Sequence, residues 1–360
     1  MHTILRKGPP LAAIGCLIML ALIANRRNWS ALSFIGSFPW ASFKTVFISI
    51  LLEAIPFVLL GVLFSALLQV FVSEQTIRRW TPRNPLLGVL FACSLGILFP
   101  LCECGMIPIV RSLMRKGMPV FIAVTFILAG PILNPVVYAS TYMAFRSHPE
   151  IAYSRMALAF AVAAVIGLLV YRFVKRSPLL PDPTGNAYSH HHSHDHPAHS
   201  GGNDRYVAMH THSERPDSRR PFANMANKLK ATLSHASDEF FDMGKYLIFG
   251  AMLTAIIQTT VARDSLAAIG QGEFSSHLFM MGFAYVLSLC STSDAFVASS
   301  FATTFTAGSL LTFLVFGPML DLKNTLMLLS TFRIRFVVFL TLAVACAILL
   351  GSRAIELLFL

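Results

Sequence analysis

Leu98-Phe99-Pro100-Leu101-Cys102-Glu103-Cys104-Gly105-Met106-Ile107-Pro108 is the stretch that decides the fold, and it lies within an apolar run from Leu86 to Val110. Two thiols and a carboxylate fall within three residues, and prolines and a glycine surround them. Irregular backbone at membrane depth is tolerated only where protein or a water-filled cavity satisfies its N–H and C=O groups. Ionisable residues inside a membrane segment are functional-site candidates. The stretch therefore predicts a broken membrane helix that carries the substrate site of a transporter.

The composition is typical of a helical membrane protein. The chain has 360 residues, 55% of them hydrophobic and 12% charged, and several apolar segments reach the roughly 20 residues that a transmembrane helix needs. We predict an all-α polytopic membrane protein with about 8 to 10 transmembrane or re-entrant helical segments. The net charge of +11 comes from Lys and Arg residues that mostly flank apolar segments, where they set orientation, so no nucleic-acid partner is expected. The six cysteines lie in or beside apolar segments, which argues against a secreted disulfide framework.

Two parts of the chain carry a related pattern. Cys102 is followed 28 residues later by Gly130-Pro131-Ile132-Leu133-Asn134, and Cys290 is followed 27 residues later by Gly317-Pro318-Met319-Leu320-Asp321. Internal repeats with matching helix breaks build the midplane site of many secondary transporters. We therefore predict two repeated membrane halves with broken helices. Positive residues flank the first broken segment on both sides, so we expect it to dip in and return, which would invert the second half.

Hydrophobicity divides the chain into four parts. Residues 1–44 are expected to form an N-terminal transmembrane helix (Pro9 to Ala24) and a loop, and residues 45–174 the first membrane repeat. Residues 175–240 are expected to form a His-rich flexible linker, because hydrophobicity falls abruptly and prolines are frequent there. Residues 241–360 complete the chain as the second repeat. The charge pattern places the linker in the cytoplasm.

The predicted substrate site combines thiols with acidic and amide side chains from both halves. Sulfur donors match soft or borderline acceptors such as Cu(I), Zn(II) or trivalent arsenicals, although a buried cysteine can also pack as a small hydrophobe. The run from Ser288 to Asp294 could equally cap a helix that starts near Ala295, and Asp321 could simply pair with Lys323. We expect the Cys-Glu-Cys motif to face the second-half thiol and its neighbouring acid across the midplane. The predicted substrate residues are Cys102, Glu103, Cys104, Asn134, Cys290, Ser291, Asp294 and Asp321.

Two further features indicate proton and metal handling. Glu53 is a lone acid just before Pro56 in an apolar segment, so it is a candidate proton carrier, with a place near the lipid headgroups as the alternative. Eight of the twelve histidines lie in the linker between His190 and His212, and imidazole suits Zn, Cu and Ni. A polar tract without a role is the alternative interpretation. The auxiliary metal-binding candidates are His190, His191, His192, His194, His196, His199, His210 and His212.

The Cys-Glu-Cys motif, the segment Gly130-Pro131-Ile132-Leu133-Asn134-Pro135 and the segment from Cys290 to Asp294 resemble the ArsP-type predicted permease family, which includes organoarsenical efflux permeases. The resemblance covers about Thr45 to Leu350. Within that family, a branch with a His-rich central loop is described as copper/zinc efflux transporters, and the tract from Ser189 to His212 looks like that branch. The resemblance implies an inner-membrane efflux permease for thiophilic metals or metalloids.

The sequence therefore predicts a multi-pass permease of the cytoplasmic membrane that exports zinc or copper by secondary transport. It is not expected to be an enzyme or to hold a cofactor, since the transported Zn or Cu ion is the ligand. The chain has no Walker-type ATP-binding motif, and it carries no signal for an oligomeric state. Efflux of trivalent arsenicals is the alternative within the transporter class. A membrane thiol oxidoreductase, for which the one-residue spacing of Cys102 and Cys104 would strain a disulfide, and a metal sensor are alternatives of other classes.

Overall fold

The computed structural model describes residues 39–82, 84–98, 102–174, 178–180, 221–260 and 273–359. The predicted helix from Pro9 to Ala24 and the linker histidines lie outside the described residues. The described part is helical and has no strand, with one isolated bridge between Leu179 and Phe332. The predicted all-helical class is confirmed.

Apart from the short helix α3 (Glu74–Trp80), the described helices follow the same order twice. Each half begins with a long helix, and the next helix ends before the cysteine segment. Another helix begins at the cysteine segment, and the one after it ends near the Gly-Pro pair. A short helix and a closing long helix complete the half. The first half contains α2 (Trp40–Phe71), α3 (Glu74–Trp80), α4 (Pro85–Leu98), α5 (Glu103–Arg115), α6 (Val120–Ala129), α7 (Pro135–Ala144) and α8 (Glu150–Phe173). The second half contains α9 (Pro221–Thr260), α11 (Glu273–Leu287), α12 (Asp294–Ser299), α13 (Ala307–Met319), α14 (Leu322–Thr331) and α15 (Ile334–Phe359).

Several helical stretches are long and apolar enough to cross a membrane. In the described residues these are Trp40–Leu68, Glu150–Phe173, Glu239–Thr259, Ala307–Thr331 and Ile334–Leu358. Shorter apolar helices accompany them at Pro85–Leu98, Val120–Ala129 and Ser275–Leu287. The lengths match those needed to span a bilayer, so the chain is an integral, polytopic membrane protein.

Local sequence signals set two of the helix boundaries. The apolar segment from Pro119 to Phe145 forms two helices, α6 and α7, because Asn134 ends the irregular Gly-Pro segment by accepting a hydrogen bond from the Val137 N–H at 2.9 Å. The helix α9 begins at Pro221, inside the stretch assigned to the linker. Proline suits the first helical position, and the Ala, Leu, Met and Lys residues that follow favour helix.

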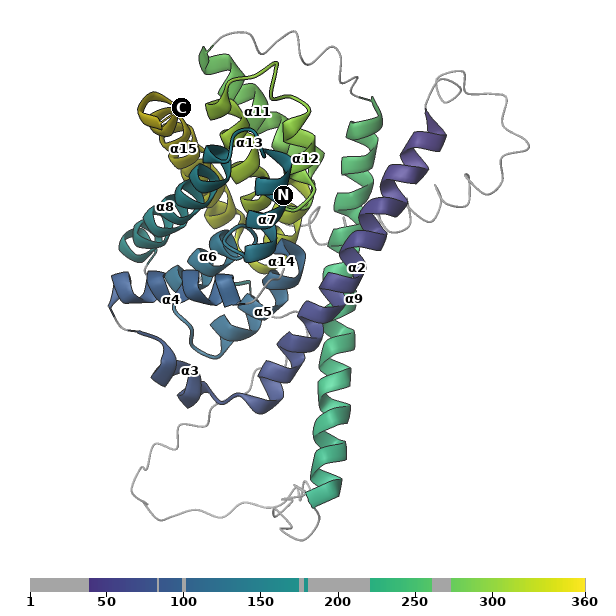
Figure 1. The fold of residues 1–360 in the computed structure, drawn as a ribbon. Coiled ribbons are helices and arrows are strands. Elements are labelled where there is room, and N and C mark those ends of the chain that lie inside the picture. Colours follow the sequence, from purple (N-terminus) through teal and green to yellow (C-terminus); the bar gives the residue numbers. More distant parts are fainter. Residues whose placement is uncertain are drawn as a thin grey trace, which may run out of the picture.

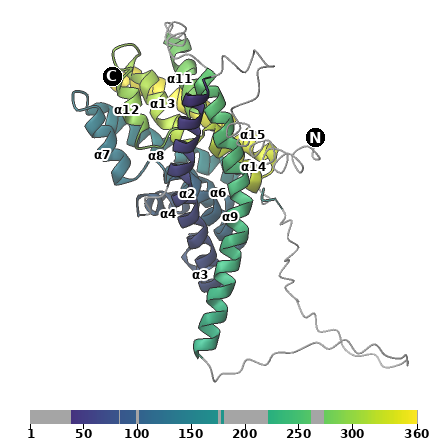
Figure 2. The same cartoon turned by 90° about the vertical axis from the view of Figure 1, so that its right-hand side faces the viewer.

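The first long helices of the two halves, α2 and α9, pack against each other in opposite directions (Figures 1 and 2). Toward one end of the pair, Phe43 shares a buried cluster with Ala255. Toward the other end, the Ser65 hydroxyl donates a hydrogen bond of 2.6 Å to the Glu239 carboxylate. Residue numbers that rise along α2 therefore fall along α9, so the helices are antiparallel. This is the relation that an inverted repeat requires of its equivalent helices.

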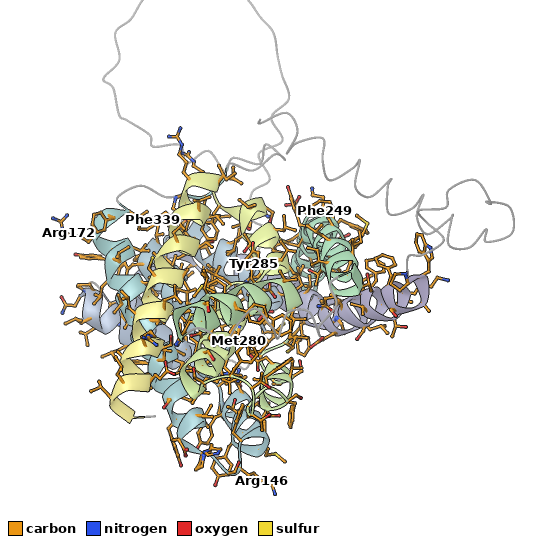
Figure 3. The ribbon with its side chains drawn as sticks, turned by 90° about the horizontal axis from the view of Figure 1, so that it is seen from above. Arg146, Arg172, Phe249, Met280, Tyr285 and Phe339 are labelled. Carbon is orange, nitrogen blue, oxygen red and sulfur yellow. The ribbon has the colours of Figure 1, made fainter. Side chains whose placement is uncertain are left out.

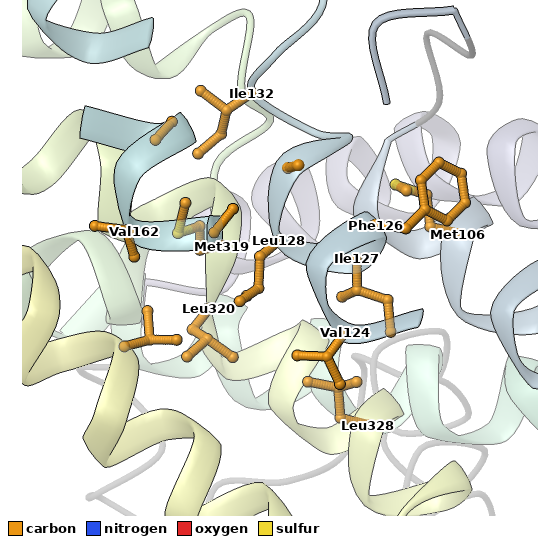
Figure 4. Close-up of a cluster of buried hydrophobic side chains, with 14 of the residues drawn as sticks. Met106, Val124, Phe126, Ile127, Leu128, Ile132, Val162, Met319, Leu320 and Leu328 are labelled. Carbon is orange, nitrogen blue, oxygen red and sulfur yellow. The ribbon is translucent and has the colours of Figure 1, made fainter. Parts of the chain in front are cut away.

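The core lies where the two halves meet. The residues of α6 from Phe121 to Ala129 and those of α13 from Gly308 to Met319 are buried. Side chains from α5, α6 and α8 gather with those of α13 and α14 in one apolar cluster (Figure 4). Seen from above, Met280 of α11 lies near the middle of the molecule, whereas Arg146 and Arg172 lie at its rim (Figure 3). Lipid tails are as apolar as these side chains, so close packing holds the helices together.

Two glycine contacts bring helix backbones together beside the cysteine motif. A Cβ atom added to Gly61 of α2 would lie 2.3 Å from the carbonyl oxygen of Gly105 in α5. A Cβ atom added to Gly96 of α4 would lie 2.9 Å from the Cα of Gly130. Side chains at these positions would therefore separate α5 from α2 and α4 from the Gly-Pro segment.

Candidate functional site

The Cys-Glu-Cys motif forms the N-terminal end of α5. Cys102 is the N-cap, with extended backbone, and its carbonyl oxygen accepts hydrogen bonds from the N–H groups of Gly105 (3.1 Å) and Met106 (3.3 Å). Glu103 and Cys104 are the first two helical residues, and both are buried. A carboxylate in the first turn suits the positive end of the helix. The helix break therefore places a carboxylate and two thiols inside the protein.

Lys323, from the second half, lies between two carboxylates. Its Nζ is 3.5 Å from Glu103 Oε1 and 3.8 Å from Asp321 Oδ2. The exposed fractions of the three side chains are 8% for Lys323, 3% for Glu103 and 0% for Asp321. Asp321 also caps α14 by accepting a hydrogen bond from the Asn324 N–H. The cluster thus joins the N-terminal ends of α5 and α14, one from each half.

Several acceptor oxygens in this cluster lack a hydrogen bond. Within the described part of the chain, Glu103 Oε2, Asp321 Oδ2 and Asn324 Oδ1 are buried and have no hydrogen-bond partner. Leaving a buried polar group unsatisfied costs about 1–3 kcal/mol, so native proteins rarely do it without a reason. The cluster therefore has free capacity for water, a cation or the donor groups of a ligand.

The thiols lie beside this charged cluster. The Cys104 thiol is within hydrogen-bonding reach of the Cys102 thiol, and neither is in a disulfide. Both lie within electrostatic range of Lys323. Cys290, in the loop between α11 and α12, lies within electrostatic range of Glu103 and of Glu53, whose side chain is exposed on α2. The structure therefore brings these predicted residues into one region: Glu53, Cys102, Glu103, Cys104, Cys290 and Asp321.

Ser288, directly after α11, has a strained backbone at this site. Its φ of 49° is in the left-handed region, the one such value outside glycine among the described residues. Its hydroxyl accepts a hydrogen bond of 3.3 Å from the Lys323 N–H and lies against the Asp321 carboxylate. A left-handed conformation costs a non-glycine residue about 1–2 kcal/mol. Such strain is concentrated at functional sites, where the surrounding structure holds it in place.

Asp294 does not join this cluster and pairs instead with Arg155 of α8. Arg155 Nη2 lies 2.7 Å from Asp294 Oδ2, and both side chains are buried. Arg155 also donates to Thr141 Oγ1 at 2.7 Å and to the carbonyl oxygen of Ser291 at 3.2 Å. Asp294 is the first residue of α12, which begins where the sequence indicated. The ion pair ties this short helix to α7 and α8 of the first half.

Asn134 and Asp321 occupy equivalent places in the two halves. Each is an N-cap, Asn134 for α7 and Asp321 for α14, and each accepts a hydrogen bond from the N–H three residues later. Their side-chain oxygens are thus engaged in ending the Gly-Pro breaks. A contact of either residue with substrate stays a prediction.

The described residues do not contain a preformed metal centre. In that part of the chain, no three His, Cys, Asp or Glu side chains come close enough together to hold a metal ion. The linker histidines from His190 to His212 fall outside it. The paired thiols of Cys102 and Cys104 are therefore the soft ligands that the described site offers together.

Sequence reasoning missed three residues of these clusters. Lys323 was considered only as a partner of Asp321, Arg155 was not considered, and Ser288 was not counted as a site residue. Lys323 and Arg155 could have been found from their charge, because a cation within or at the edge of a predicted membrane segment is costly and usually functional. Nothing in the sequence indicated the left-handed backbone at Ser288.

The chain is similar to known proteins along most of its length. A family model described as predicted permease, ArsP_1, matches residues 39–357. The UPF0718 protein YcgR of Bacillus subtilis (strain 168) is 46% identical over 314 residues, which cover 87% of this chain and 96% of that protein. A protein of Streptococcus mutans serotype c, named putative two-component membrane permease complex subunit, is 32% identical over 292 residues, or 81% of this chain and 87% of that protein. No solved structure matches the chain.

Proposed function

Because the chain belongs to the ArsP-type predicted permease family, we propose that it is a secondary permease whose substrate binds at the Cys-Glu-Cys motif between the two halves. The observation that carries this location is the buried cluster at helix ends in which two thiols meet two carboxylates, each with one oxygen that has no hydrogen bond. Secondary transporters commonly bind substrate where broken helices of two repeats meet. The family supports a transporter and gives no support to an oxidoreductase.

The adjacent thiols favour a trivalent arsenical as substrate. Methylarsenite, CH3As(OH)2, would form two As–S bonds with Cys102 and Cys104 as two As–O bonds break, and the thiol protons would leave with the hydroxyl groups as two water molecules. The complex is neutral, so no net charge enters the buried site. Zn(II) would also displace the two thiol protons, but zinc normally takes four ligands, and in the described part of the chain no three His, Cys, Asp or Glu side chains come close enough together to hold it.

Export of Cu(I) or Zn(II) is the second candidate. The His-rich tract from Ser189 to His212 favours it, because imidazole binds both metals. The family match itself extends to predicted permeases and not to a copper/zinc branch. If the protein exports metal, the chain would lie in the inner membrane with its linker in the cytoplasm. The linker histidines would then collect metal for the thiols.

Uptake by vesicles of purified, reconstituted protein tests the proposal. We expect Cys102→Ser combined with Cys104→Ser to reduce methylarsenite uptake at least about tenfold, the effect of about 1.4 kcal/mol of binding energy. Cys346→Ser, which changes an exposed cysteine of α15, is the matched control and should transport like the wild type. Methylarsenite uptake that survives loss of both thiols would overturn the proposed site.

Deleting Ser189 to His212 separates the two candidate substrates. Methylarsenite transport should be unchanged by the deletion, because the two thiols alone supply both bonds to arsenic. Uptake of zinc or copper in preference to methylarsenite, and its loss on deletion, would favour the metal-export candidate instead.

A partner subunit is a further part of the proposal. The streptococcal relative is named as a subunit of a two-component membrane permease complex, and we extend that organisation to this chain. A coexpressed second membrane subunit that copurifies with the chain and raises its transport rate in the same vesicles would support it. A transport rate that no second membrane subunit raises would contradict it.

A further inference from the structure

A second buried titratable cluster lies between α11, α13 and α15. His277 Nε2 is 2.9 Å from Glu356 Oε2. His277 Nδ1 is 2.8 Å from Thr312 Oγ1 and 3.2 Å from Ser352 Oγ. The imidazole is fully buried, whereas the Glu356 side chain is 20% exposed. The carboxylate thus connects a buried base to the protein surface.

The first half has an equivalent place, which two threonines identify. In α6 the Thr125 hydroxyl donates to the carbonyl of Phe121 at 2.8 Å, and in α13 the Thr312 hydroxyl donates to the carbonyl of Gly308 at 3.0 Å. Each threonine faces the closing long helix of its half. In the first half, a Cβ atom added to Gly167 of α8 would contact Thr125. In the second half, Thr312 hydrogen-bonds to a serine hydroxyl of α15. The surroundings of Thr125 and Thr312 can therefore be compared directly.

The two equivalent places have different chemistry. In the first half, Phe121 packs edge-on against Tyr171 of α8, with ring centroids 5.1 Å apart. In the second half, Gly308 stands where Phe121 is, and a Cβ there would lie 2.5 Å from Glu356 Oε2. An aromatic contact in one half is thus replaced in the other by a carboxylate and an imidazole. Packing alone does not require this replacement, because the first half closes the same space with apolar rings.

The cluster can satisfy both protonation states of His277. When the imidazole is neutral, Nε2–H donates to Glu356, and Nδ1 accepts from the hydroxyl of Thr312 or Ser352. When the imidazole is protonated, Nδ1–H donates to a hydroxyl oxygen. The hydroxyls then turn to backbone carbonyls already within reach, Gly308 at 3.0 Å for Thr312 and Leu349 at 3.3 Å for Ser352. A proton can therefore bind and leave without orphaning a buried polar group.

The charges around the pair also permit this exchange. The charged groups that the structure records facing the imidazole are both on α15, Glu356 in direct contact and Arg353 behind it, while α13 contributes hydroxyls. Arg353 Nη1 lies 3.6 Å from Glu356 Oε2 and its side chain is 33% exposed. The arginine offsets the carboxylate charge when the imidazole is neutral.

We propose that His277 and Glu356 bind the proton that drives this permease. The role in transport rests on the proposed function, whereas the binding of a proton by the pair does not. Proton binding joins α11 to α15 through an imidazolium–carboxylate contact, and proton loss weakens that contact. Imidazole commonly serves as a proton shuttle in proteins, because its nitrogens can both bind and release a proton.

Two transport modes of reconstituted protein test this role. Uptake of methylarsenite driven by a pH gradient needs the proton site, whereas exchange of internal for external methylarsenite at equal pH needs only the substrate-loaded carrier. We expect His277→Gln and Glu356→Gln to reduce gradient-driven uptake at least about tenfold and to keep exchange within about twofold of wild type. Tyr171→Phe, at the equivalent first-half place, is the control and should retain both modes. Parallel loss of both modes, or unchanged gradient-driven uptake, would overturn the role.

A titration that needs no transport tests the proton site itself. Purified wild-type protein should take up one more proton on acidification than the His277→Gln variant. This difference is expected even if methylarsenite is not transported, so failure of the permease proposal and failure of the proton site can be told apart. Equal proton uptake by the two proteins would show that His277 does not exchange a proton.

Discussion

Replacing Lys323 with methionine should strongly destabilise the protein. The change Lys323→Met keeps most of the apolar volume of the side chain but removes the ammonium between Glu103 and Asp321. Both carboxylates then stay buried, with side-chain exposures of 3% and 0%. At distances of 3.5 and 3.8 Å, each lost attraction amounts to about 4–5 kcal/mol at an effective dielectric constant of about 20. Loss of the cost of burying the lysine offsets part of this, so we expect a net loss of about 3–5 kcal/mol.

Removing the charge of one acid instead of the base should destabilise the protein much less. Glu103→Gln leaves one ammonium facing one carboxylate, since Lys323 keeps Asp321, and we expect a loss of about 1 kcal/mol or less. Glu103→Gln should also recover about 2 kcal/mol in the Lys323→Met background, because it removes the repulsion between the two carboxylates. Lys323→Met should therefore lose more stability than Glu103→Gln, because two acids share one base.

Unfolding by sodium dodecyl sulfate in mixed micelles, followed by circular dichroism, measures these free energies. Lys245→Met is the control: its Nζ lies 2.6 Å from Asp242, but the lysine side chain is 39% exposed. Exposed pairs contribute about 0–1 kcal/mol, so the control should lose little. A Lys323→Met protein within about 0.5 kcal/mol of wild type, or a double variant no more stable than Lys323→Met, would refute the reasoning.

Two further predictions concern backbone contacts at the same site. Gly61→Ala should lower the yield of folded protein in size-exclusion chromatography, because its Cβ would lie 2.3 Å from the Gly105 carbonyl oxygen. Gly282→Ala is the control and should fold as well as wild type, because a Cβ there meets nothing within 4 Å. Equal yields of the two variants would contradict the close approach of Gly61 to Gly105. Ser288→Gly should be about 1 kcal/mol more stable than Ser288→Ala in the same unfolding assay, because glycine adopts a φ of 49° without strain. An alanine variant as stable as the glycine variant would contradict the strain at this position.

Features that depend on short stretches of sequence were predictable. The Gly-Pro pairs indicated helix breaks, and a break lies beside each pair: α6 ends at Ala129, before the first pair, and α13 ends at Met319, just after the second. Asn134 and Asp321 are the caps of the following helices. The Ser-Thr run indicated a helix beginning near Ala295, and α12 begins at Asp294. Such features depend on missing N–H donors, capping oxygens and backbone preferences, all of which are local.

The partners of the charged residues could not be predicted. Glu103 and Lys323 come from different halves, and so do Arg155 and Asp294. Which acid meets which base depends on how α5 packs on α14 and on how α12 lies against α8, and nothing in the local pattern specifies these contacts. For this reason the sequence placed Asp294 beside the cysteines, whereas the structure places Lys323 there.

The pairing of Glu103 with a base from the second half has a consequence for biosynthesis. Lys323 is added to the chain 220 residues after Glu103, and at about 5–20 residues per second a ribosome needs about 10–45 s to reach it. During that interval the first half must be delivered to the bilayer with its acid uncompensated. We therefore expect Glu103 of the nascent first half to be protonated or to stay near the lipid surface until Lys323 arrives, because an unpaired carboxylate is costly to bury. The permease becomes one stable unit only when the last third of the polypeptide has emerged.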